Sequence, residues 1–137
     1  MKLNKPTEEE LKQMDAKLTP GYAKFFVKEA KFKISKIGNE QIELKLSITD
    51  VLQVNKTLWV YLVNHPQMMW KIKHFCEQAG LTKEFETGEL EDYMCLNKEG
   101  ICILKLEKQK DKEERIVVND FAQTDTKIEK FDDEIPF

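Results

Sequence analysis

The sequence predicts a mainly β protein in which one helix separates three early strands from two later ones. Hydrophobic and polar residues alternate over residues 41–48, which is the pattern of a strand with one buried face. Over residues 66–80 the hydrophobic residues recur at helical spacing instead. Two more short alternating stretches follow that helix. With 137 residues, the chain has enough length for one domain with a modest core.

The first strand is expected from Tyr22 to Ile34, with a bend in its middle. Its hydrophobic residues fall on one parity before Lys28 and on the other parity after Glu29. The two sets are Phe25 and Val27, then Ala30, Phe32 and Ile34. A strand changes the face of its side chains when one extra residue is inserted, so this pattern predicts a β-bulge.

The next two strands follow a turn at Gly38-Asn39. The second strand, residues 41–48, places its hydrophobic residues on one face: Ile42, Leu44, Leu46 and Ile48. A loop at 50–57 leads to a third strand, Leu58 to Val63.

The helix begins near Pro66, which suits the first helical position, with Asn64 or His65 as the cap. Gly80 is expected to end it. Its buried stripe would be Met69, Ile72, Phe75, Cys76 and Ala79. Trp70 lies just off this stripe; we favour packing, and an exposed interaction residue is the alternative.

The remaining body is less regular. Residues 81–96 are expected to be irregular, with a turn at Gly88 and a brief extended piece at 93–96. A fourth strand at 101–106, a solvated hairpin tip at 108–114 and a fifth strand at 115–118 complete the body.

The chain divides into three parts. Residues 1–18 form an N-terminal helical extension, since Thr7 and Glu10 make a capping box. Residues 19–121 form the folded domain, and residues 122–137 a flexible acidic tail. The element order of the domain is that of the OB-fold, a five-stranded, partly open barrel that binds oligonucleotides across strands 2 and 3.

Trp59 and Tyr61 are the candidate base-stacking residues on the third strand. If Leu58, Val60 and Leu62 face the core, both aromatic rings point outward. Outward aromatic residues beside lysines are the stacking platforms of proteins that bind single-stranded nucleic acid. Reversed parity, or cover by a helix, is the alternative.

Three lysines on the non-core parity of strands 1 and 2 are the candidate phosphate contacts: Lys31, Lys33 and Lys45. Lys24 and Lys28 would extend this track, and Lys36 lies at the turn. Arg115 opens strand 5 and is expected to contact a phosphate, or to pair with Glu113 or Glu114. Residues 125–137 carry the whole formal net charge of −3, so residues 1–124 are neutral and a nucleic-acid face on the body is allowed.

The last six residues have the composition of a docking peptide: Asp132, Asp133, Glu134, Ile135, Pro136 and Phe137. Phe137 can fill an apolar slot while basic residues beside that slot bind the carboxylates. A solvated acidic terminus is the alternative, but a bare charge run would not need Ile-Pro-Phe after it.

This ending resembles the C-terminal tip of bacterial and phage single-stranded-DNA-binding proteins, with Glu134 where Asp is usual. The body resembles a family of small phage proteins encoded beside recombination and replication genes. The matching features are Pro20-Gly21-Tyr22 and the helix from Trp70-Lys71-Ile72-Lys73 to Ala79-Gly80-Leu81. These resemblances imply an OB-fold protein that binds and protects single-stranded DNA without strong sequence preference. The tail would recruit replication or recombination proteins.

Other function classes have little support in the sequence. There is no catalytic motif, so we expect no enzymatic activity. Metal-ligand spacing is also missing among the cysteines and histidines, so we expect no cofactor; these residues are Cys76, Cys95, Cys102, His65 and His74. No apolar run follows residues 1–6 or reaches membrane-spanning length, so we expect a cytoplasmic protein, in a bacterial host if phage-encoded. The sequence leaves open whether the protein is a homo-oligomer. A protein-binding adaptor with little DNA affinity is the alternative function.

Overall fold

A computed structural model describes residues 17–108 and 114–123 of the chain. Its strands are β1 (Gly21–Ile34), β2 (Glu40–Asp50), β3 (Asn55–Val63), β4 (Glu99–Lys108) and β5 (Glu114–Phe121). Its helices are the 3-10 turn η1 (Pro66–Met68) and the α-helices α2 (Met69–Ala79), α3 (Thr82–Thr87) and α4 (Asp92–Cys95). The mainly β class and the helix between the third and fourth strands are therefore confirmed.

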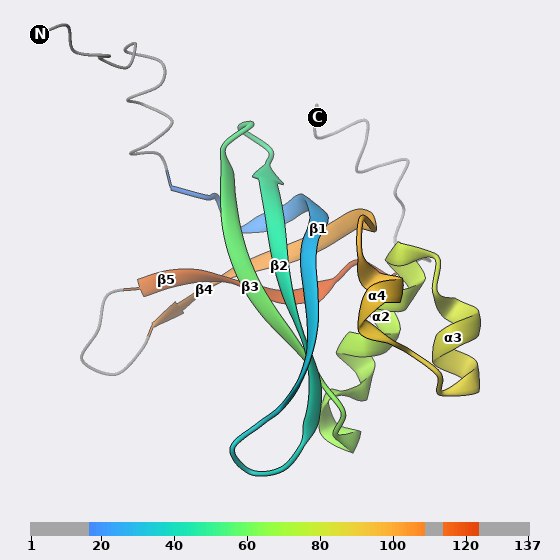
Figure 1. The fold of residues 1–137 in the computed structure, drawn as a ribbon. Coiled ribbons are helices and arrows are strands. Elements are labelled where there is room, and N and C mark those ends of the chain that lie inside the picture. The colour runs from blue at the N-terminus through green and yellow to red at the C-terminus, as the bar shows by residue number, and fades with distance from the viewer. Residues whose placement is uncertain (1–16, 109–113, 124–137) are drawn as a thin grey trace, which may run out of the picture.

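The five strands form one antiparallel sheet in the order β3-β2-β1-β4-β5. The sheet is strongly curved, and its edge strands β3 and β5 approach each other without pairing into a closed ladder (Figure 1). The central strand β1 pairs with β2 along most of its length but with β4 only from Gly21 to Phe26.

The predicted bulge in β1 is confirmed, because the register with β2 shifts between Val27 and Glu29. Before the bulge Phe25 and Val27 are buried, and after it Ala30 lies opposite Leu44. Beyond this point β1 pairs with β2 alone. The two strands continue as a hairpin, here called the β1–β2 arm (residues 31–42), which projects at the bottom of Figure 1.

The expected core parity of β2 and β3 is confirmed. Leu44, Leu46 and Ile48 are fully buried on β2, and Val60 and Leu62 are buried on β3. β2 extends two residues beyond its predicted end, because Asp50 is itself buried. Its Oδ1 accepts hydrogen bonds from the backbone N–H groups of Leu52 and Val54, both at 2.9 Å. Its Oδ2 accepts one from Thr19 N–H at 2.8 Å.

The predicted helix has the expected signals at both ends. His65 is the cap of η1, and its Nδ1 accepts from Gln67 N–H at 3.1 Å. Gly80 ends α2 with a left-handed φ of 74°. Phe75 of α2 packs against the rings of Phe25 and Phe121, whose centroids lie 5.9 and 5.1 Å away.

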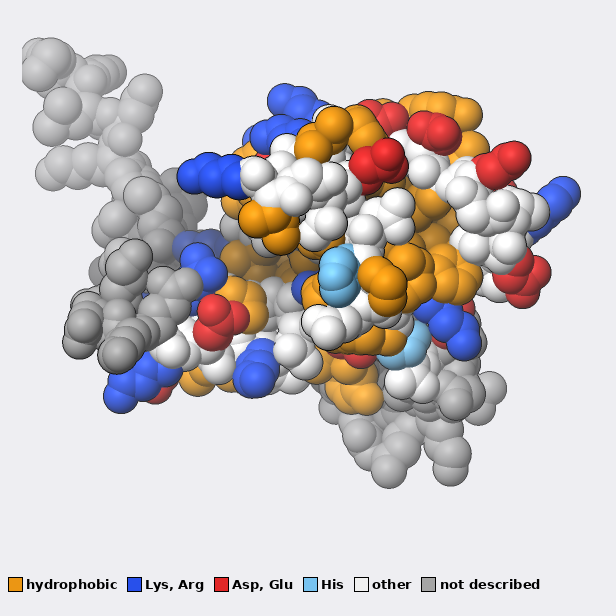
Figure 2. All heavy atoms as spheres, turned by 90° about the horizontal axis from the view of Figure 1, so that it is seen from below, with side chains coloured by type: hydrophobic (Ala, Val, Ile, Leu, Met, Phe, Trp, Pro, Cys, Tyr) orange, Lys and Arg blue, Asp and Glu red, His pale blue; other side chains and the backbone are white. Residues whose placement is uncertain are grey.

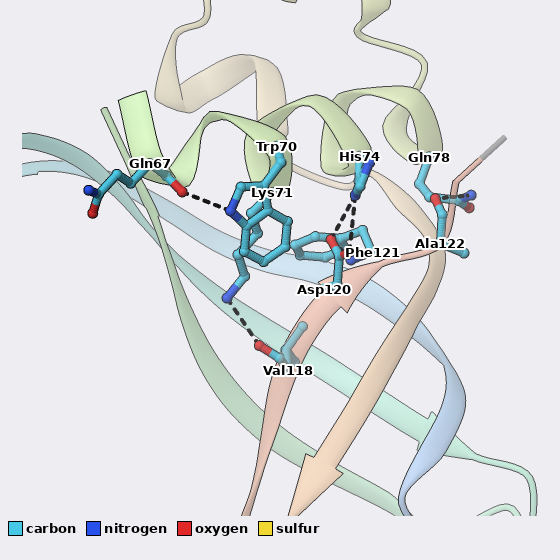
Figure 3. A network of polar contacts seen from close by, with 9 residues as sticks. All are labelled: Gln67, Trp70, Lys71, His74, Gln78, Val118, Asp120, Phe121 and Ala122. Atoms are coloured by element: carbon cyan, nitrogen blue, oxygen red, sulfur yellow. Dashed lines mark hydrogen bonds and ion pairs between the residues drawn. The ribbon is translucent and has the colours of Figure 1, made fainter. Parts of the chain in front are cut away.

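A row of polar contacts fixes α2 to β5 (Figure 3). Lys71 Nζ donates to Val118 O at 3.1 Å, and burial holds the pKa of this lysine below its usual range. His74 Nδ1 lies 2.9 Å from Asp120 Oδ1, and Gln78 Nε2 donates to Ala122 O at 2.9 Å. These contacts hold the helix across the open side of the sheet.

Two expectations about this region were wrong. Residues 81–96 contain the helices α3 and α4 where irregular chain and an extended piece were expected. Leu81 and Phe85, four residues apart, pack on the core and give α3 a buried side. Trp70 is not packed away: its side chain is 42% exposed, and its Nε1 donates to Gln67 O at 2.8 Å.

Most of the predicted N-terminal helix (1–18), of the hairpin tip (108–114) and of the acidic tail (122–137) lies outside the described residues. In the part of the chain that the structure describes, no helix is both long and apolar enough to cross a membrane.

Candidate nucleic-acid interface

One face of β1, β2 and β3 points away from the core and gathers most of the predicted DNA-binding residues. We call it the outer face. β1 contributes Lys24, Phe26, Lys28, Glu29, Lys31 and Lys33; β2 contributes Gln41, Glu43, Lys45, Ser47 and Thr49; β3 contributes Asn55, Thr57, Trp59, Tyr61 and Val63. The strand register aligns these side chains in rows across the sheet, such as Lys31–Glu43–Tyr61 and Glu29–Lys45–Trp59.

Trp59 and Tyr61 point outward, as their parity predicted. Their side chains are 51% and 42% exposed, while Leu58, directly before Trp59, packs against the core. Phe26 on β1 is a third exposed ring on this face, and the sequence analysis missed it. The signal was present, because Phe26 lies on the opposite parity to the buried Phe25 and Val27. Three aromatic side chains on β1 and β3, the strands on either side of β2, make a surface on which unpaired bases can stack.

Lys45 lies over the indole of Trp59. Its Nζ is 5.4 Å from the ring centroid, within the range of a cation–π contact. The same Nζ is 3.8 Å from Glu29 Oε2. The ammonium group is thus held at the edge of the stacking surface, where it can meet the phosphate of a base stacked on Trp59.

Glu43 links Lys33 to Tyr61. Lys33 Nζ donates to Glu43 Oε2 at 2.9 Å, and this bond lowers the pKa of Glu43 and raises that of Lys33. A hydrogen bond to Glu43 also raises the pKa of the Tyr61 phenol. The Glu43 carboxylate therefore lies beside two predicted DNA-binding residues, at a position where a phosphate could bind instead.

The outer face is basic in total. Its five lysines and two glutamates give a formal net charge of +3. Lys28 reaches across the face, where its Nζ donates to Thr57 Oγ1 at 2.9 Å. Lys31 lies in the same row as Tyr61, beyond Glu43. A chain of phosphates crossing β1 and β2 would meet these ammonium groups beside the aromatic rings of β3.

Arg115 is not brought to this face. It lies on β5, the opposite edge strand, and its Nη2 is 3.8 Å from Glu107 Oε1 on β4. The antiparallel register places Arg115 directly opposite Glu107, and Glu113, one of its two expected partners, lies outside the described residues. In a β-sheet, the side chain opposite on the paired strand is closer than the side chain of the next residue in the same strand, because consecutive side chains point to opposite faces.

No second kind of site is built by the cysteines and histidines. The three thiols are free and buried, and burial raises the pKa of each to about 12. Over residues 17–108 and 114–123, no three His, Cys, Asp or Glu side chains are grouped so as to hold a metal ion. The predicted partner-binding residues of the tail, 132–137, lie outside the described residues.

The chain matches no known protein-family model and no curated protein sequence.

Proposed function

We propose that this protein binds and protects single-stranded DNA across the outer face, with little dependence on base order. The observation that carries the proposal is the exposure of Trp59, Tyr61 and Phe26 among lysines on one face of the sheet. None of these three rings belongs to the hydrophobic core of the described residues. They are suited to unpaired bases, because every base has a face on which an aromatic ring can stack.

The fold supports the same proposal, and we assign it to the OB-fold. β1 is bent at a bulge and pairs with both β2 and β4, α2 follows β3, and the edge strands β3 and β5 approach each other. Proteins of this fold bind oligonucleotides across strands 2 and 3. Those strands are the ones that carry Trp59, Tyr61, Lys45 and Glu43 here.

In the proposed complex, bases stack on Trp59 and Tyr61 while phosphates approach Lys31, Lys33 and Lys45. Two of these lysines are already paired, Lys33 with Glu43 and Lys45 with Glu29. DNA must exchange those carboxylates for phosphates. The Lys45–Glu29 pair is the more exposed of the two, so its exchange costs little, whereas the Glu43 side chain is only 12% exposed and its separation from Lys33 costs more.

The acidic tip, Asp132 to Phe137, supplies the second part of the proposed function. It recruits replication or recombination proteins during the growth of a phage in the host cytoplasm. Between such encounters its carboxylates compete with DNA for the lysines of the outer face.

An adaptor that binds protein through the same face is the second candidate, because Glu29 and Glu43 already neutralise two of its lysines. Titration of the full-length protein with oligo-dT and with a duplex of equal length separates the two. The proposal expects single-strand binding well above duplex binding, weakening with salt at a slope of about −0.7 per phosphate contact. Equal binding of both DNAs would contradict the proposal, and weak or absent binding of single-stranded DNA with intact partner binding through the tail would select the adaptor.

A further inference from the structure

A groove on the opposite side of the β1–β2 arm from the outer face is hydrophobic inside and acidic at its edge. It has a volume of about 350 Å³ and lies between the arm, α2 and α3. Its apolar lining includes Phe32, Leu62, Met69, Ile72, Phe85 and Leu90. Three glutamates also line it: Glu40, Glu84 and Glu91.

Glu84 is one of three glutamates in a groove that no lysine, arginine or histidine of the described residues lines. Its Oε2 atom is buried and has no hydrogen-bond partner in the described part of the chain. A buried carboxylate oxygen without a donor is costly, so a cation or another donor that entered the groove would be stabilised there. The groove therefore favours an occupant that combines an apolar side chain with a positive charge.

The tip of the arm has this composition. Ile34 and Ile37 are 66% and 85% exposed, and Lys36 is exposed beside them. Two backbone hydrogen bonds close the turn at the tip: Gly38 N–H donates to Ser35 O at 2.9 Å, and Ser35 N–H donates to Asn39 O at 2.8 Å. A preformed turn loses little conformational entropy when it binds.

The apolar surface runs from the groove to the tip on one side of the arm. Phe32 lines the groove, and Ile34 follows it on the same parity of β1. Seen from this end of the molecule, hydrophobic side chains reach the surface and acidic side chains gather toward α3 (Figure 2). The patch has a basic, apolar part and an acidic, apolar part. About a two-fold axis, the basic part of one copy can therefore contact the acidic part of a second copy, and the reverse.

We propose that two copies of this chain form a two-fold dimer in which the arm tip of each copy enters the groove of the other. Ile37 fills the apolar interior, and Lys36 approaches the glutamates of the partner. DNA and the acidic tail are unsuitable occupants, because Glu40, Glu84 and Glu91 repel them. The outer face stays free, since Lys31 and Lys33 lie on the opposite parity of the arm from Phe32 and Ile34. The dimer is therefore independent of the proposed DNA binding.

Sedimentation velocity of the full-length protein without DNA tests the dimer. The wild type is expected to form dimers, and Ile37→Asp is expected to weaken association at least about tenfold, because the change acts at both symmetric contacts. Ile37 is so exposed that its replacement leaves the monomer folded. The matched control is Leu52→Asp in the β2–β3 turn, a 69% exposed leucine at the other end of β2, which is expected to dimerise normally.

A charge exchange identifies the contact itself. Lys36→Glu and Glu91→Lys are each expected to weaken the dimer, and the double variant to regain much of the lost affinity. A wild type that remains monomeric would overturn the proposal. So would an Ile37→Asp variant that dimerises like the wild type, or a double variant no better than the two single ones.

Discussion

The ammonium group of Lys45 lies 5.4 Å from the centre of the Trp59 ring, on the row of the sheet that also holds Glu29. The two side chains come from adjacent strands, and the register places them directly opposite each other. A base that stacks on the free part of the indole would bring its phosphate close to this ammonium group. The pair thus combines, at one position, the two interactions that binding of single-stranded DNA requires.

Glu43→Gln is expected to tighten binding of single-stranded DNA about two- to fivefold at low salt, because it removes a carboxylate that competes with phosphate for Lys33. The gain should shrink at high salt as charges are screened. Fluorescence titration with oligo-dT measures it. Glu86→Gln, on the exposed side of α3, is the control that removes an equal charge away from the outer face.

The same variant changes the titration of Tyr61. Glu43 raises the pKa of the Tyr61 phenol by hydrogen bonding, so Glu43→Gln should bring that pKa back toward its ordinary value near 10. Glu43 itself has a lowered pKa and Lys33 a raised one. Their hydrogen bond therefore stabilises the folded protein at pH values above the unfolded pKa of the carboxyl. It is lost only as pH falls through the folded pKa of Glu43, or rises through that of Lys33. Glu43 and Lys33 both stay charged between about pH 6 and 9, so the gain in DNA affinity of Glu43→Gln over the wild type should be constant there. A gain that varied over this range would contradict the account.

Asp50→Ala is expected to lower the free energy of unfolding by about 3 kcal/mol, because buried Asp50 accepts hydrogen bonds from Thr19, Leu52 and Val54. Asp50→Asn keeps one acceptor oxygen and should cost less. Urea denaturation followed by circular dichroism gives both values. Equal stability of all three proteins would show that these bonds contribute nothing net.

Deleting Ile135-Pro136-Phe137 is expected to abolish capture of partner proteins from a bacterial lysate, while three acidic residues of the tip remain. DNA affinity should change little. Replacing Asp132, Asp133 and Glu134 with neutral residues should instead tighten DNA binding, and this gain should shrink with salt. Recovery of the same partners by the shortened protein would refute the docking peptide.

The alternation of hydrophobic residues was sufficient to predict β2, the bulge in β1 and the outward direction of Trp59 and Tyr61. These features depend on local periodicity, and burial of one face enforces them. The pairing of Arg115 with Glu107 was not predictable, because it depends on the register of β4 and β5. The positions of Phe85 and Leu90 in the groove beside the arm likewise depend on where α2 directs the following chain. Short helices of this kind gain their stability from tertiary packing, which a single sequence does not display.

The most direct measurement of the central claim is the affinity of Trp59→Ala for oligo-dT, compared with Trp70→Phe. Both tryptophans are exposed, but Trp59 lies on the outer face and Trp70 on α2. We expect Trp59→Ala to lose about 1–3 kcal/mol of binding free energy, with an unchanged melting temperature and a reduced quenching of tryptophan fluorescence. Trp70→Phe should bind like the wild type. Unchanged DNA affinity in Trp59→Ala, with or without a loss of stability, would contradict the assignment of the outer face as the DNA-binding surface.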